Sequence, residues 1–135
     1  MSNGSKMVLQ KSLFQYVFDS SALINIERNN KITALRSRRG EILIPEKVAI
    51  EVNQPNSPLH RFVSRYKQVI TEFQNNEEEK YLIVRSQVGI DDGEAAAIAI
   101  ALNRQLPLVI DDKKARTKAG SHGIHTLSWN EFLAT

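Results

Sequence analysis

The segment QYVFDSSALINI, residues 15–26, indicates the architecture of the chain. Its first part, Tyr16-Val17-Phe18, is β-branched and aromatic and predicts a buried strand that ends at Asp19. Ser20 and Ser21 then precede apolar positions at helical spacing, so we expect the strand to run directly into a helix. This strand-to-helix step is typical of α/β proteins, in which helices pack against a sheet.

The same pattern recurs along the chain. Apolar strands are expected at residues 41–44, 108–110 and 124–127, and residues 69–71 are read as either a short strand or an irregular segment. The clearest helix is the alanine-rich segment 92–104. Apolar strands that alternate with helices predict the α/β class, with a central parallel β-sheet of about five strands flanked by helices on both faces.

Punctuating residues predict the shorter helices. Pro45 is expected in the first turn of a helix over residues 46–52, where a missing N–H is tolerated. A helix around residues 32–35 is expected to end at Gly40. The acidic run 77–79 opens another helix, and we expect its charges to stabilise the helix dipole rather than to carry chemistry.

Length and composition indicate one folded domain. The chain has 135 residues, of which 41% are hydrophobic and 24% are charged, as is ordinary for a globular protein. We read residues 1–14 as a leader or N-terminal extension and residues 15–135 as a single domain. The absence of cysteine excludes disulfides and thiolate sites and favours a cytoplasmic location, and no membrane span is expected. The net charge of +3 slightly favours polyanionic partners.

Acidic residues occur where the expected strands end. Asp19 follows the first strand, and Asp111 or Asp112 follows a later one. The carboxyl ends of parallel strands meet at one edge of a sheet, where such proteins bind ligands. Glu51 and Glu94 lie on helices that can lean over this edge. We therefore expect four carboxylates from distant parts of the sequence to converge.

Converging carboxylates need a cation. Two like charges about 4 Å apart repel by about 1 kcal/mol in water and about 4 kcal/mol at an effective dielectric constant of about 20. Oxygen ligands from a few carboxylates suit Mg²⁺ or Mn²⁺, which retain water ligands and also bind substrate phosphate. Such ions lower the pKa of an attacking water and stabilise a leaving 3′-oxygen, so the acids indicate phosphodiester cleavage.

The four acid-bearing segments resemble the acidic motifs of PIN-domain nucleases. They read VFDSSALINI, IPEKVAIEV, DDGEAAAIAIAL and PLVIDDKKAR, and the resemblance extends from Tyr16 to Leu133. It implies a PIN-like fold and a Mg²⁺- or Mn²⁺-dependent endoribonuclease that leaves 5′-phosphate and 3′-hydroxyl ends. It further implies the toxin of a toxin–antitoxin pair, with RNA as substrate, and is compatible with an antitoxin partner and a homodimer.

The resemblance also implies roles for single residues. Asp19 matches the first metal-binding aspartate, and Ser20 matches the hydroxyl after it, which supports metal-bound water. Ser21 continues the motif as a helix cap. Glu51 matches the second acid and Glu94 the third, in the Gly-Glu-Ala form of one subgroup.

The fourth acid has two candidates. Asp111 matches it in that subgroup, whereas other PIN proteins place it two residues beyond a strand-end threonine, a position that Ile110 occupies here. Asp112 is therefore the alternative. The expected catalytic acids are Asp19, Glu51, Glu94, Asp111 and Asp112, and all of these except Glu51 are candidate metal ligands. Among the nearby basic residues, Arg116 is preferred for contact with RNA phosphate, while Lys113 and Lys114 are ordinarily solvated.

Structural interpretations exist for the same residues. Helix capping explains Asp19-Ser20-Ser21, the pair Asp91 and Glu94, and Asp111-Asp112, and a solvated helix surface explains Glu51. The remaining candidates, His60, His122 and His125, lack metal-ligand spacing and receive no role, and Trp129 is expected in the core.

Two other functions stay open. A non-catalytic PIN-like RNA-binding or scaffold domain would keep the fold without a productive metal. A response-regulator-like receiver also uses strand-end aspartates with Mg²⁺. However, its acidic pair comes early and its phosphoacceptor lies on a middle strand, whereas here the pair comes late.

Overall fold

Five short strands form one parallel sheet in the computed structural model, which describes residues 14–135. The strand order is β3-β2-β1-β4-β5. The strands are β1 (Tyr16–Phe18), β2 (Ile42–Pro45), β3 (Ile70–Thr71), β4 (Leu108–Val109) and β5 (Thr126–Leu127). The predicted leader, residues 1–14, lies outside the described residues except for Phe14.

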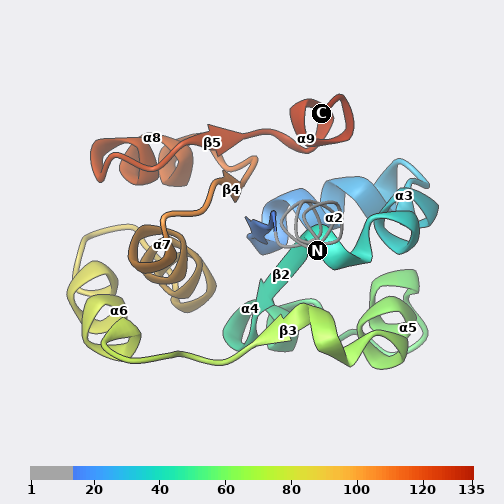
Figure 1. The fold of residues 1–135 in the computed structure, drawn as a ribbon, viewed down its shortest axis with the longest axis horizontal. Coiled ribbons are helices and arrows are strands. Elements are labelled where there is room, and N and C mark those ends of the chain that lie inside the picture. Colours follow the sequence, from blue (N-terminus) through green and yellow to red (C-terminus); the bar gives the residue numbers. More distant parts are fainter. Residues whose placement is uncertain (1–13) are drawn as a thin grey trace, which may run out of the picture.

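Helices cover both faces of this sheet (Figure 1). On one face lie α2 (Ser20–Arg28), α3 (Ile32–Ser37), α5 (Pro58–Arg65) and α9 (Trp129–Leu133). On the other face lie α6 (Glu77–Arg85), α7 (Asp92–Arg104) and α8 (Lys113–Ser121). Helix α4 (Glu46–Glu51) follows β2 directly and packs against both α2 and α7. The predicted α/β fold, with a five-stranded parallel sheet between helices, is confirmed.

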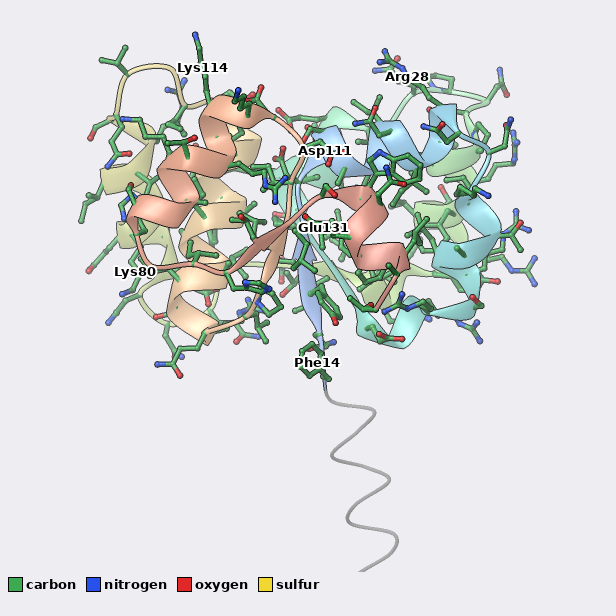
Figure 2. The ribbon with its side chains drawn as sticks, turned by 90° about the horizontal axis from the view of Figure 1, so that it is seen from above. Phe14, Arg28, Lys80, Asp111, Lys114 and Glu131 are labelled. Carbon is green, nitrogen blue, oxygen red and sulfur yellow. The ribbon has the colours of Figure 1, made fainter. Side chains whose placement is uncertain are left out.

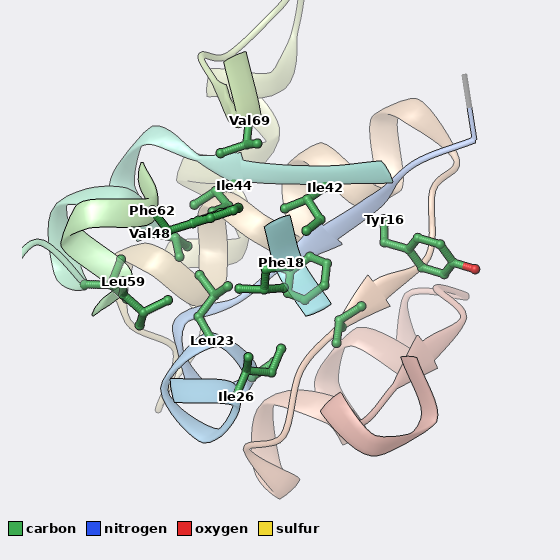
Figure 3. Close-up of a cluster of buried hydrophobic side chains, with 14 of the residues drawn as sticks. Tyr16, Phe18, Leu23, Ile26, Ile42, Ile44, Val48, Leu59, Phe62 and Val69 are labelled. Atoms are coloured by element: carbon green, nitrogen blue, oxygen red, sulfur yellow. The ribbon is translucent and has the colours of Figure 1, made fainter. Parts of the chain in front are cut away.

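The alternation of side chains along β1 divides the interior into two cores. Tyr16 and Phe18 belong to the core under α2, α5 and α9 (Figure 3). Both rings pack edge-on against Phe132. Val17 points to the opposite core, which is filled by the alanines of α7. Burial on both faces explains why the strands read as continuous apolar runs in the sequence.

Three boundaries differ from the sequence expectations. Helix α3 ends at Ser37 and is followed by a 3-10 turn, η1 (Arg39–Glu41), so Gly40 lies inside this turn and does not cap the helix. Pro45 is the last residue of β2 rather than part of a helical turn. Another 3-10 turn, η2 (Lys67–Val69), leads into β3, which resolves the ambiguous segment as a strand.

The acidic start of α6 also differs from expectation, because Glu77 is fully buried. Its carboxylate accepts hydrogen bonds from Arg104 at 2.8 and 2.9 Å and from Asn103 at 2.9 Å. These bonds hold the pKa of Glu77 below its usual value although burial acts in the opposite direction. Glu77 therefore ties the start of α6 to the end of α7.

Among the described residues, no helix is long and apolar enough to cross a membrane.

Candidate active site

Strands β1 and β4 are joined at their carboxyl ends by Ser21. The backbone N–H of Asp19 donates to the carbonyl of Val109 at 3.0 Å, which aligns the two strand ends. The Ser21 hydroxyl donates to Oδ2 of Asp19 at 3.0 Å and accepts the backbone N–H of Asp111 at 2.9 Å. Ser21 thus fixes the first acidic segment against the last, and this edge of the molecule lies opposite Phe14 (Figure 2).

Asp19 is the most deeply buried acid of this edge, with 1% of its surface exposed. Its Oδ2 caps α2, accepting the N–H of Ser21 at 3.3 Å. Its Oδ1 is buried and has no hydrogen-bond partner within residues 14–135. Burial raises the pKa of Asp19, and the charge of Asp91 raises it further. A buried carboxylate oxygen without a partner is costly unless a ligand reaches it.

Glu94 lies beside Asp19 at the start of α7. It forms a capping box with Asp91: the Glu94 N–H donates to Asp91 Oδ1 at 2.8 Å, and the Asp91 N–H donates to Glu94 Oε1 at 3.1 Å. Glu94 is only 8% exposed, and burial raises its pKa from 4.5 to about 7, with further contributions from Asp91, Asp19 and Asp112. The Glu94 side chain therefore caps α7 and also lies close to the other acids.

Glu51, the last residue of α4, reaches the same place from the other side. Its carboxylate lies on Gly93, where an added Cβ would come within 2.6 Å of the Glu51 Cδ. Desolvation and the charges of Asp91 and Asp19 raise the pKa of Glu51 to about 7. A side chain at position 93 would therefore displace the Glu51 carboxylate from this point of α7.

The two late aspartates differ in how their oxygens are used. Asp111 accepts Nδ2 of Asn25 at 2.6 Å on one oxygen and the N–H of Trp129 at 2.9 Å on the other. Asp112 uses Oδ1 to cap α8 through the N–H of Ala115 at 3.0 Å, and its charge raises the pKa of Glu94. Asp111 is therefore bound between α2 and α9, whereas Asp112 acts electrostatically on the acids of the edge.

Comparison with known proteins agrees with this arrangement. The family model DUF3368, described as a PIN domain, matches residues 15–128. The chain belongs to the PIN-domain family. A solved structure, PAE2754 from Pyrobaculum aerophilum, superposes on this PIN domain with a TM-score of 0.62 at 16% sequence identity, covering 90% of this chain and 95% of that one. This likeness shows the fold. No curated protein matches the sequence.

The acids of this PIN domain suit a divalent ion, as PIN domains typically bind. Asp19 offers a buried oxygen that has no partner within residues 14–135, and desolvation together with the charges of Asp91 and Asp19 raises the pKa of both Glu51 and Glu94 to about 7. Within residues 14–135, no three histidine, aspartate or glutamate side chains are grouped so that they could hold a metal ion together. An open set fits Mg²⁺, which is usually bound through one or two carboxylates together with water and phosphate oxygens.

Arg116 is bound to the first turn of α9. Its guanidinium donates to Oε1 of Glu131 at 3.0 Å, at the start of α9, and its Nε lies 3.5 Å from Oγ1 of Thr126. Lys113 and Lys114, by contrast, are exposed at the first turn of α8, directly after Asp112. In the described part of the chain, Lys113 and Lys114 therefore have no ion-pair partner, whereas Arg116 is paired with Glu131.

The sequence alone missed several residues that build the site. Ser21 and Asp91 appeared only as helix caps, yet Ser21 bridges two strand ends and Asp91 acts on three other acids. Asn25 was not singled out, although its spacing of four residues from Ser21 places both on one face of α2. Gly93 was quoted in the third motif, but no pattern shows that another helix rests on it.

Proposed function

We propose that this PIN domain is a Mg²⁺- or Mn²⁺-dependent endoribonuclease that hydrolyses RNA phosphodiester bonds. PIN domains are generally nucleases. The observation that carries the proposal for this chain is Asp19: it is buried, its Oδ1 has no partner among the described residues, and Asp91, Glu51 and Glu94 crowd it. The ionised form of such a group is unfavourable unless a cation neutralises its charge.

The residues divide the work by their surroundings. Asp19 and Glu94 would hold the ion, with Ser21 fixing the orientation of Asp19 through its hydroxyl. The chemistry that Mg²⁺ or Mn²⁺ supplies in such a site is activation of a water and stabilisation of charge on the leaving oxygen. Glu51 would accept the proton of the attacking water, because its carboxylate lies at this edge against Gly93 and is not assigned to the ion.

For the fourth acid we propose Asp112. Its charge acts on Glu94, and only one of its oxygens is used in capping α8 among the described residues. Asp111 is assigned a positioning role, since Asn25 and Trp129 occupy both of its oxygens and link α2 to α9. Arg116 is not needed for substrate contact in this scheme, because it pairs with Glu131.

We further propose that the protein acts in the cytoplasm as the toxin of a toxin–antitoxin pair. The cysteine-free composition suits a reducing compartment. An antitoxin would block the acidic edge, and a homodimer is compatible with the fold. Co-purification of the chain with the product of a neighbouring gene, and loss of RNA cleavage in that complex, would support this assignment.

A non-catalytic PIN-like RNA-binding or scaffold domain is the second candidate. It is favoured by the open arrangement of the acids, since no three of these side chains within residues 14–135 are grouped so that they could hold a metal ion together. This candidate predicts RNA binding without Mn²⁺-dependent hydrolysis.

RNA cleavage by purified protein in Mn²⁺ separates the two candidates. Asp19→Asn and Glu94→Gln should each lower the cleavage rate by about 100-fold or more, as loss of a preorganised electrostatic group does in other enzymes. Glu131→Gln is the matched control, because Glu131 forms the same kind of capping box at the start of α9 but has a lowered rather than a raised pKa. Full activity in Asp19→Asn would refute the mechanism.

A further inference from the structure

A groove lies beside the acidic edge, between helix α8 and the turn that follows α6. Its volume is about 800 Å³, and its walls are the turn at residues 88–90 and the α8 face that contains three lysines. Both walls begin at the acids: the turn runs into Asp91, and α8 is capped by Asp112. We call this feature the α8 groove.

The charge of the α8 groove is uniformly positive. Lys113, Lys114 and Lys118 line it, all three are exposed, and no acidic residue is among its lining residues. Lys114 and Lys118 are four residues apart and therefore project from one face of α8. None of the three forms an ion pair in the described part of the chain. Figure 2 shows Lys114 at the same edge of the molecule as Asp111.

The opposite wall presents an apolar side chain on a fixed turn. Val88 is 93% exposed. The turn is held by Arg85, which donates to the carbonyl of Ile90 at 3.1 Å and pairs with Asp92. Gly89, with φ of +83°, allows the backbone to reverse there. The turn therefore holds an apolar surface in solvent, facing a row of cations.

We propose that the α8 groove binds single-stranded RNA next to the phosphate that is cut, with Lys114 and Lys118 on the phosphates and Val88 against an unpaired base. The proposal rests on the nuclease function above. The nine residues of α8 span about 13 Å, which accommodates a short stretch of strand. A single strand exposes both phosphates and base faces, whereas a duplex hides its bases. A strand in the groove runs directly onto Asp91 and Asp112.

The test measures binding apart from cleavage. Fluorescence anisotropy of a labelled single-stranded RNA is followed over a range of salt concentrations, with full-length protein carrying Asp19→Asn. Lys114→Ala/Lys118→Ala is compared with Lys67→Ala/Lys80→Ala, which removes the same charge outside the groove. Two lost phosphate contacts should weaken binding by about 10- to 30-fold and reduce the salt slope by about 1.4. The control should leave the slope unchanged.

Val88→Ser tests the other wall, because it removes the apolar surface without changing the charge of the groove, and a side chain that is 93% exposed contributes little packing to the fold. It should weaken binding of the single strand and leave binding of a duplex of the same sequence unchanged. Equal slopes for the two lysine variants, or equal sensitivity of single strand and duplex, would overturn the proposal. If the wild-type protein does not cleave RNA but these binding differences are still observed, the nuclease function is rejected and the α8 groove remains an RNA-binding site.

Discussion

Replacing Glu94 with glutamine should make the metal-free protein more stable at pH 8. Glutamine has the same shape, carries no charge, and can still accept the N–H of Asp91 in the capping box. The substitution therefore removes the buried charge and little else. The expected gain is a direct measure of how unfavourable the ionised carboxylate is without a cation.

The magnitude follows from the pKa of Glu94. Burial, Asp91, Asp19 and Asp112 raise it from 4.5 to about 7, while Glu94 is only 8% exposed. At about 1.4 kcal/mol for each pH unit, the ionised side chain lowers the free energy of unfolding by about 3 kcal/mol. Because the folded pKa is raised, this stability is complete below about pH 4.5 and is lost as the pH rises through about 7.

Urea unfolding in EDTA, followed by the fluorescence of the single tryptophan, tests this expectation between pH 4 and pH 8. With an m-value of about 2 kcal/mol/M, the midpoint of Glu94→Gln should exceed that of wild type by about 1.5 M at pH 8 and match it near pH 4. Glu131→Gln should show no gain at pH 8, since the backbone of Ser128 and the charge of Arg116 lower the pKa of Glu131. A Glu94→Gln protein no more stable than wild type at pH 8 would refute the reasoning.

Further substitutions test three other features of the structure. Gly93→Ala should displace the Glu51 carboxylate and lower RNA cleavage while leaving stability unchanged or higher. The control is Gly120→Ala in α8, which has open space around it and should only add stability of about 1 kcal/mol. Equal cleavage by both variants would contradict the role of Gly93. Asp112→Asn should lower Mn²⁺ affinity, whereas Asp111→Asn should lower the melting temperature. The reverse pattern would show that Asp111 binds the ion and Asp112 stabilises the fold. Glu77→Ala should destabilise the fold by about 3 to 5 kcal/mol in urea unfolding, because it leaves Arg104 without its buried partner, and a loss below about 1 kcal/mol would show that the pair is not needed.

The fold could be predicted from the sequence because its strands are buried on both faces. Apolar runs such as Tyr16-Val17-Phe18 and Leu108-Val109 have no polar alternation, and each is followed by a residue that caps the next helix. These local signals do not depend on distant residues. The end of α3 was mispredicted at Gly40 because the chain turns by a 3-10 step there, and the glycine does not need a positive φ.

The acids of the site were predicted as residues, but their separate surroundings were not. The sequence shows Asp111 and Asp112 as equivalent neighbours, and only packing shows that Asn25 and Trp129 hold the first. The burial of Glu77 likewise depends on Arg104, which lies a whole helix later in the chain. Contacts between distant segments decide such cases, and one sequence contains no periodic signal for them.

Calorimetric titration of the metal-free protein with Mn²⁺ at pH 7.5 tests the shared cation site most directly. Wild type should take up Mn²⁺ saturably and release protons from Glu51 and Glu94 as the ion binds, and Asp19→Asn should take up no Mn²⁺. Absence of uptake by wild type, or the same uptake by Asp19→Asn, would contradict the claim that these acids hold a common ion.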